Sequence, residues 1–192
     1  MEVAQFVLDT QLLPGGRMPL RVFEPRYLRM VADAMAGRRP FGICMPDPKA
    51  EPDTPARLCP LGTLVEVVDF SSLKDGRLGI IVEGRQRYHI LSSEQEEDKL
   101  HVAQVELLPN WPAAPLPTGA EPLRDLLSQV FGEHPELAEL YPAPRFDDAA
   151  WLSARWLELL PLSGPERQGL IGGQDCQQAL RFLCDQLRAS SS

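Results

Sequence analysis

The chain has 192 residues, of which 44% are hydrophobic and 24% are charged, a composition typical of a globular protein with one large domain or one domain plus a small extension. The formal net charge of −8 excludes the overall basic surface of a nucleic-acid-binding domain, so we expect no nucleic-acid partner. No apolar run approaches the length of a membrane span, and the N-terminal MEVAQFVLDT lacks the basic start of a signal peptide, so we expect no membrane partner.

The first part of the chain predicts strands with one helix among them. Strands are expected over residues 4–10, 17–23 and 40–46. A helix is expected over Pro25–Ala36, because proline suits the first helical position and Gly37 is a typical stop. The apolar face of this helix, at helical spacing, comprises Tyr27, Met30, Val31 and Ala34.

A β-hairpin is the clearest local signal. Residues 62–73 and 77–91 read as strands on either side of Asp75-Gly76, and glycine accepts the positive φ of a tight turn without steric cost. Residues 100–108 alternate between two faces and predict a further strand. Together these segments predict about five or six mostly antiparallel strands.

The composition changes after the last predicted strand. Residues 109–122 contain five prolines and have few backbone donors for a helix or a sheet, so we expect a linker there. The expected domain organisation is a β-rich domain over residues 1–108, the linker, a helical subdomain over residues 123–188, and a disordered tail over residues 189–192.

The segments after the linker read as helices. Amphipathic or capped runs cover residues 121–134, 147–160, 163–173 and 175–187. Ser163 and Glu166 have the spacing of a capping box, and Asp175 is a good N-cap. A core-facing stripe is predicted for Leu152, Trp156, Leu159 and Leu160.

The sequence lacks the common catalytic and cofactor motifs. It has no GxxxxGK[ST], GxSxG, HExxH or GxGxxG pattern, so we expect no ATPase site, no cofactor, no metal and no catalytic residue. The three histidines, His89, His101 and His134, are scattered along the chain. The four cysteines form no CxxC pair, and we expect reduced thiols in a cytoplasmic protein.

Charged residues alternate along the second strand of the hairpin. Glu83, Arg85, Arg87 and His89 would share one face, either as a binding stripe for a peptide carboxylate or acidic partner, or as the solvated face of an antiparallel sheet. Trp111, within the proline-rich segment, is a candidate contact residue, either against its own domain or against a partner. Arg85, Arg87, His89 and Trp111 are therefore the candidate peptide-binding or partner-binding residues.

Glu24 lies where the second predicted strand meets the helix. The following proline pushes its backbone away from helical geometry, and its charge suits a helix start. Arg21 and Arg26 lie within reach, but no second group forms an acid–base pair with this carboxylate. The residues favour a structural joint over a catalytic or binding site.

Two stretches together carry a family resemblance. LLPGGRMPLRVFEPRYLRMV, residues 12–31, resembles the opening motif of the N-terminal, substrate-binding domain of Lon proteases. Residues 61–91 are similar to that family's Gly-Thr strand, hairpin and GxxRxxI segment, and residues 157–171 resemble its Leu-Pro-x-[ST] helix entry. The signature residues, which we interpret as structural, are Pro19, Phe23, Glu24, Pro25, Arg26, Tyr27, Gly62, Gly84 and Arg87.

The resemblance implies an α+β fold, a mostly antiparallel β pseudo-barrel with one inserted helix, followed by a C-terminal helical bundle. It also implies a non-catalytic module that binds unfolded or degron-bearing polypeptide, or a protein partner, in proteolysis or quality control. The chain looks like a stand-alone short form, because the ATPase and Ser-Lys protease domains of Lon proteases have no counterpart in it. Alternative functions are an adaptor or assembly protein for another complex, and a small hydrolase whose active site follows no motif.

Overall fold

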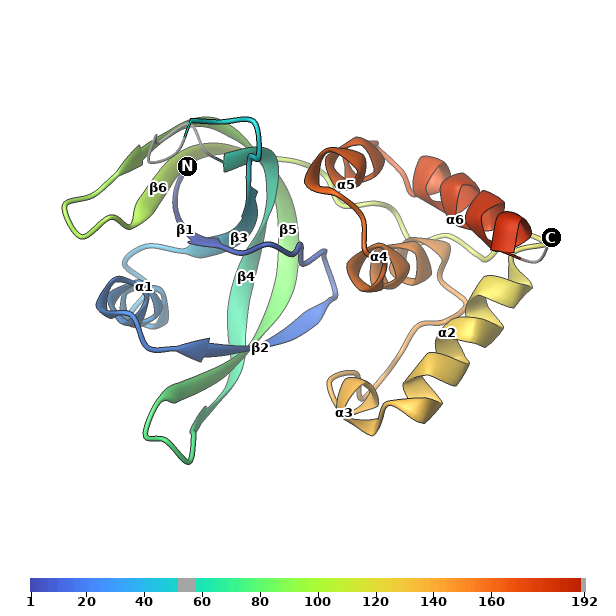
Figure 1. The fold of residues 1–192 in the computed structure, drawn as a ribbon, viewed down its shortest axis with the longest axis horizontal. Coiled ribbons are helices and arrows are strands. Elements are labelled where there is room, and N and C mark those ends of the chain that lie inside the picture. The colour runs from blue at the N-terminus through green and yellow to red at the C-terminus, as the bar shows by residue number, and fades with distance from the viewer. Residues whose placement is uncertain (52–57, 191–192) are drawn as a thin grey trace. The chain divides into compact units, whose positions relative to one another are not determined.

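The computed structural model describes residues 1–51 and 58–190 of the chain. The chain divides into two compact units, Met1–Pro109 and Asn110–Ser192. The first unit holds the strands with one helix among them, and the second is helical (Figure 1). The predicted α+β architecture is therefore confirmed.

A ring-like sheet forms the first unit. Its elements are β1 (Glu2–Val7), β2 (Arg17–Val22), α1 (Pro25–Met35), β3 (Phe41–Pro46), β4 (Leu58–Ser72), β5 (Leu78–Gln95) and β6 (His101–Leu107). Among the described residues the sheet has six strands in the order β2-β5-β4-β3-β1-β6, and an additional β5–β6 pairing closes the ring. The β1–β3 pair is parallel and the other described pairs are antiparallel.

The length of β5 explains why the ring is a pseudo-barrel. Its first part, from Leu78 to Glu83, pairs with β2, whereas its last part, from Tyr88 to Gln95, pairs with β6. Strand β4 pairs with β5 along most of this length. The first part of β5 therefore lies between β2 and β4, and the last part helps to close the ring.

Helix α1 packs its predicted apolar face against the sheet. Pro25 is at the helix start, and Glu24 is in the N-cap position with an extended backbone. Met30 and Val31 are buried in a cluster with strand residues such as Phe6 and Phe41, and Tyr27 and Ala34 pack against that cluster. The helix ends at Met35, and Gly37 follows with a φ of +69°, which is accessible to glycine without strain.

A second, smaller core forms around Tyr88, which is fully buried. The Tyr88 hydroxyl donates a hydrogen bond of 2.5 Å to the side-chain oxygen of Gln5. Its ring lies over Gly42 and Gly62, where an added Cβ would lie 2.5 Å and 2.4 Å from Tyr88 atoms. Glycine at these positions makes room for the tyrosine, because real Cβ atoms do not approach so closely.

The second unit is a bundle of helices. Its elements are α2 (Glu121–Glu133), α3 (Pro135–Ala138), α4 (Ala149–Leu159), α5 (Gly164–Ile171) and α6 (Gln177–Ser190). The short helix α3 is not among the predicted helices. The predicted capping box of α5 is present, because Ser163 accepts from the Glu166 amide and Glu166 accepts from the Ser163 amide. The Asp175 carboxylate accepts from the Gln177 amide at 2.9 Å at the start of α6.

Helix α4 is buried on almost all sides. The predicted stripe is partly wrong, because Leu152 is buried but Leu159 is 43% exposed. The first seven residues of α4 are all buried, including Arg155. A central helix that contacts neighbours on all sides has no single apolar stripe. The periodicity of the α4 sequence therefore wrongly assigned Leu159, near the helix end, to the core.

The proline-rich segment packs within the second unit. The Ala149 amide donates to the Ala114 carbonyl at 2.8 Å, and Pro115 forms an isolated bridge with Asp148. The prolines of this segment lack backbone donors, but the segment still offers carbonyl acceptors, and the Ala114 carbonyl is one of them. Helix α6 continues to Ser190, and residues 191–192 of the predicted tail lie outside the described residues.

Candidate functional site

The strands β2, β4 and β5 extend beyond the ring as a three-stranded arm, which comprises residues 17–22 and 66–83. Figure 1 shows the β4–β5 hairpin projecting from the rest of the first unit. At its tip the Gly76 amide donates to the Leu73 carbonyl, and Gly76 has a φ of +78°, so the predicted Asp75-Gly76 turn is confirmed. One face of the arm packs into the main core, where Val22, Ile80 and Val82 are buried.

A groove of about 390 Å³ lies on this arm. It is lined by Pro19, Leu20, Arg21, Asp69, Phe70, Ser71, Leu73, Gly79, Ile80 and Ile81. Strand pairing aligns Arg21, Gly79 and Ser71 in one row across the arm. A second row, two residues away, aligns Pro19, Ile81 and Asp69. The alternation of side chains along each strand places the two rows on the same face.

Other side chains of the arm pack closely over Gly79. A Cβ added there would lie 2.9 Å from Leu73 Cδ2 and 3.1 Å from Ser71 Oγ. Gly79 therefore makes room for the Leu73 and Ser71 side chains, which pack over it. This glycine was not singled out by the sequence, in which it reads as one residue of a regular strand.

Two aromatic side chains are exposed on or beside the arm. Phe70 lines the groove and is 68% exposed, and Phe23, directly after β2, is 55% exposed. The Arg77 guanidinium lies over the Phe23 ring, 4.9 Å from its centroid. Exposed aromatic side chains close to a groove are typical of an interaction surface, because water solvates them poorly.

The predicted charged stripe on β5 is broken in the structure. A register shift between Leu64 and Val65 leaves Arg85 as an extra residue in β5. Arg85 is exposed and forms ion pairs with Glu66 and Glu83, whereas Arg87 is buried. His89 is half-buried. The four residues therefore do not share one solvated face, because the bulge changes the phase of the alternation.

Arg87 and Trp111 make hydrogen bonds to the backbone of their own units. The Arg87 guanidinium donates to the Pro109 carbonyl, and burial lowers the pKa of Arg87. The Trp111 indole donates to the Gly173 carbonyl at 3.0 Å. Trp111 thus contacts its own helical unit, which is one of the two alternatives that the sequence left open. A partner-binding role for these residues stays a prediction.

The remaining signature residues form joints and close approaches. Glu24 pairs with Arg26 at 2.7 Å, and the Glu24 carbonyl accepts from the Tyr27 amide. Pro25 starts α1. A Cβ on Gly84 would lie 2.3 Å from the Leu13 carbonyl oxygen, so only glycine fits where residues 13–16 cross β5.

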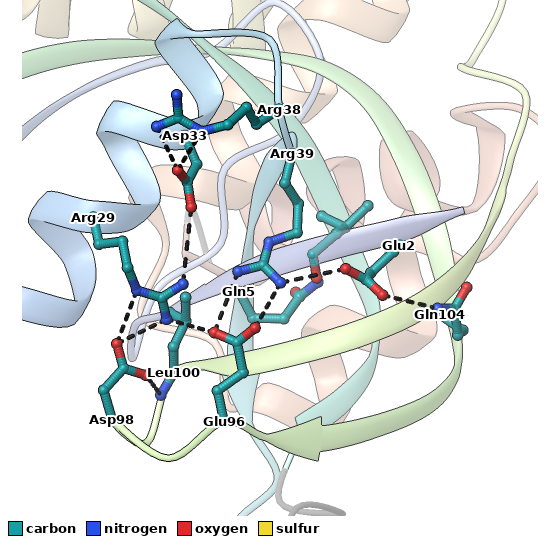
Figure 2. A network of polar contacts seen from close by, with 11 residues as sticks. Glu2, Gln5, Arg29, Asp33, Arg38, Arg39, Glu96, Asp98, Leu100 and Gln104 are labelled. Carbon is teal, nitrogen blue, oxygen red and sulfur yellow. Dashed lines mark hydrogen bonds and ion pairs between the residues drawn. The ribbon is translucent and has the colours of Figure 1, made fainter.

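A polar network connects α1 with the turn between β5 and β6 (Figure 2). Arg29 donates to Glu96, and to Asp98 at 2.7 Å, while Arg39 donates to Glu96 at 2.7 Å and to Glu2 at 3.3 Å. Hydrogen bonds, first from Arg39 and then from Arg29, lower the pKa of Glu96. The acidic turn between β5 and β6 therefore binds the guanidinium groups of Arg29 and Arg39.

The structure offers no metal-binding cluster within residues 1–51 and 58–190, where no group of three or more His, Cys, Asp or Glu side chains is arranged to hold an ion. His101 contacts Gln95, and His134 contacts Glu136, so these two histidines lie in separate surroundings. The four cysteines are free thiols. Within the same described ranges no helix is long and apolar enough to cross a membrane.

The second unit carries a larger groove, of about 740 Å³, formed by α2 and α6. It is lined by Gly119, Pro122, Asp125, Leu126, Gln129, Cys184, Leu187 and Arg188. Its walls are amphipathic helix faces with charges of both signs, and Leu126 is the exposed apolar residue among them. Nothing in its geometry favours one kind of ligand.

Comparisons with known proteins agree on one family. The profile of the ATP-dependent protease La (LON) substrate-binding domain matches residues 2–189. The crystal structure of a Lon N-terminal domain protein from Xanthomonas campestris is 28% identical, with a TM-score of 0.74, and the match covers 95% of this chain and 96% of that chain.

The curated relatives include Lon proteases, which are much longer than this chain. The Lon protease of Flavobacterium johnsoniae is 21% identical over 170 residues, which are 85% of this chain and 21% of that protein. The Lon protease of Dictyoglomus thermophilum is 29% identical over 100 residues, which are 52% of this chain and 12% of that protein. The chain thus spans about a fifth or less of the length of these relatives.

Proposed function

The chain belongs to the LON substrate-binding domain family, and we propose that it binds unfolded or degron-bearing polypeptide as a non-catalytic module linked to proteolysis. The observation that carries this proposal is the arm, where an apolar groove lies beside two exposed aromatic side chains. A folded protein normally buries such side chains, whereas an unfolded client exposes its own apolar side chains and can cover them.

The shape of the arm supports an extended client rather than a small molecule. The groove of about 390 Å³ is shallow, and its lining comes from three neighbouring strands. An extended segment with alternate side chains matches such a corrugated strand surface. Among the residues predicted from the sequence, Arg85 suits a contact with such a client best, because it is exposed next to the arm.

The proposal that the chain is non-catalytic is supported by the motifs that its sequence lacks. The chain contains no GxxxxGK[ST] loop for ATP and no HExxH zinc-protease motif. Free thiols are consistent with a reducing compartment such as the cytoplasm. ATP-dependent cleavage belongs to the longer relatives, and we propose recognition alone for this chain.

Binding to a labelled model protein tests the proposal. The protein is compared in its native form and in a reduced, alkylated, unfolded form, by fluorescence anisotropy. We expect tighter binding of the unfolded form. We also expect Phe70→Ser combined with Phe23→Ser to weaken that binding by about tenfold, because each exposed ring loses its apolar contact.

Leu91→Ser is the matched control, because Leu91 is 62% exposed on β5 outside the arm. Equal affinity of the wild-type protein for the native and unfolded forms would reject polypeptide binding. An effect of Leu91→Ser as large as that of the double phenylalanine variant would reject the arm as its location.

A further inference from the structure

We propose that both open edges of the arm are blocked against strand addition, β2 by Pro19 and β4 by Asp69, so that a client is held through its side chains and not through its backbone. The part that concerns the client rests on the proposed function, whereas the blocked edges follow from the geometry of the arm alone. The basis is the direction in which the backbone groups of the two outer strands point.

The arm has two open edges, because its three strands lie side by side with β5 in the middle. Among the described residues, β2 pairs with β5 alone. Strand β4 pairs with β3 only as far as Val65, so its part from Glu66 to Ser72 has β5 on one side and no strand on the other within the described chain. An open strand edge offers its backbone groups to any extended chain, including a second copy of this protein.

The backbone nitrogen of Pro19 faces the open edge of β2. The Gly84 amide donates to the Gly16 carbonyl at 2.9 Å, so Gly16 directs its carbonyl toward β5. Backbone groups alternate in direction along a strand, and Pro19, three residues further on, therefore points its nitrogen away from β5. This nitrogen carries no hydrogen, and Pro19 is exposed. The middle of the six-residue edge strand thus has no donor for an incoming strand.

The Phe70 amide faces the open edge of β4, and the Asp69 side chain occupies it. The Leu73 amide donates to the Arg77 carbonyl at 2.9 Å, so Leu73 faces β5 and, by alternation, Phe70 faces outward. The Asp69 carboxylate accepts from this Phe70 amide at 2.9 Å. An incoming strand would have to displace the carboxylate and would bring its carbonyl oxygens close to a negative charge. A register shift between Val67 and Asp69 also interrupts the regular edge.

The faces of the arm remain available to a client when its edges are blocked. The exposed Phe70 ring and the groove belong to these faces. Contacts through apolar side chains need no particular backbone register, whereas an added strand forms a ladder of backbone hydrogen bonds. The arm therefore suits recognition of apolar side chains in a client whose backbone it leaves unpaired.

Two fluorescein-labelled peptides of one sequence test recognition through side chains. Both carry a Leu-Phe core, and in the second the backbone nitrogens of alternate residues are methylated, which removes the donors for a ladder and keeps the side chains. We expect the wild-type protein to bind both with affinities within about threefold of each other. Pro19→Thr combined with Asp69→Thr restores a donor on β2 and frees one on β4. This double variant should bind the unmethylated peptide at least about fivefold more tightly than the methylated one.

Sedimentation velocity of the same double variant tests the edges without a client. We expect concentration-dependent larger species that the wild-type protein does not form, because the unblocked edges can pair with those of a second copy. Ser72→Thr is the matched control: it adds a strand-favouring side chain at an exposed position of the β4 edge, keeps Pro19 and Asp69, and should sediment as the wild type. Asn instead of Thr at position 69 of the double variant should reduce the larger species, because its side-chain oxygen can still accept from the Phe70 amide.

A folded double variant with the sedimentation profile and the peptide affinity ratio of the wild type would overturn the blocked edges. Circular dichroism checks folding, and the single variants Pro19→Thr and Asp69→Thr take its place if the double variant does not fold. A wild-type preference for the unmethylated peptide of more than about threefold would overturn recognition through side chains. Failure of the wild-type protein to bind the unfolded model protein would reject the proposed function, while sedimentation would still decide whether the edges are blocked.

Discussion

Glu24 is the residue at which a strand becomes a helix. Its backbone has φ −72° and ψ 134°, which suits the residue before Pro25, and its side chain makes no capping hydrogen bond. The carboxylate instead holds Arg26, whose guanidinium also donates to the Lys99 carbonyl at 3.0 Å. Glu24 thus acts through Arg26 to connect the helix start with the loop before β6.

We expect Glu24→Ala to lower the free energy of unfolding by about 0.5–1 kcal/mol, the range of a partly exposed ion pair near a helix start. Chemical denaturation measures this change, and binding of the unfolded model protein should stay at the wild-type level. Full stability with lost binding would mean that Glu24 belongs to the binding site and not to a structural joint.

Arg155 shows how a charged residue is accommodated inside the helical unit. Its side chain is almost fully buried and forms a two-pronged ion pair with Glu158, with distances of 2.7 Å and 2.8 Å. The guanidinium also lies 5.4 Å from the ring centroid of Trp151 and 5.7 Å from that of Tyr141. The cation is therefore compensated by a carboxylate and by aromatic rings.

Glu158→Gln should destabilise the protein by about 2–4 kcal/mol, because it leaves a buried guanidinium without its counter-charge. The matched change is Asp185→Asn, which breaks the Asp185–Arg188 pair of the same spacing, where both side chains are more than 70% exposed. That variant should change stability by less than about 0.5 kcal/mol. Similar urea midpoints for the two variants would contradict this account of burial.

Helix α1 is held by different forces on its two sides. Met30 and Val31 pack into the core, while Arg29 binds the turn that contains Glu96 and Asp98. Burial of the Asp98 carboxylate works to raise its pKa, but hydrogen bonds from Arg29 and from the Leu100 amide outweigh burial and lower it. The ion pairs connect α1 with the turn that contains Glu96 and Asp98, which is distant in sequence. Packing of the apolar face of α1 does not make this connection.

This network should make α1 less stable at acidic pH. The pKa values of Glu96 and Asp98 are lower in the folded protein, so their contribution is fully present above the unfolded-state values of about 4.3 and 3.9. It is lost as the pH falls through the lower folded-state values. Hydrogen exchange of the α1 amides, measured from pH 6 to pH 3, should become faster relative to that of β3 amides.

Glu96→Gln is the variant that separates this effect from general acid unfolding. It removes the charge that Arg29 and Arg39 share, and it should cost about 1 kcal/mol at neutral pH and weaken the acid response. An unchanged pH dependence in Glu96→Gln would assign the response to other carboxylates.

At the scale of elements, local patterns predicted most strands and helices but not where their surfaces point. The β4–β5 hairpin follows from Asp75-Gly76 between two apolar runs, and the structure confirms it. The bulge at Arg85 has no local signal, yet it determines that Arg87 is buried and Arg85 is exposed. Because of this bulge, the sequence wrongly predicted Arg85 and Arg87 as one stripe. It also missed Phe70, whose exposure follows from strand pairing and not from a local pattern.

At the scale of the whole molecule, the division into Met1–Pro109 and Asn110–Ser192 predicts that the first unit folds alone. A protein of residues 1–109 keeps every strand pair of the sheet, both cores around Phe41 and Tyr88, and the Pro109 carbonyl that Arg87 contacts. We expect cooperative thermal unfolding with a strand-type circular dichroism spectrum. A spectrum without cooperative unfolding would mean that the helical unit is needed for folding.

The sequence by itself determined the family signature, the α+β class and the start and end of most elements, because turns, caps and apolar periodicity act between residues close in the chain. The sequence identified Gly62 and Gly84 as signature residues, but it gave no physical reason why glycine is needed at these positions. Only the tertiary structure supplied the reason: the Tyr88 ring lies against one glycine and the Leu13 carbonyl against the other. The arm and its groove were likewise decided by strand pairing across long sequence distances, which no local pattern encodes.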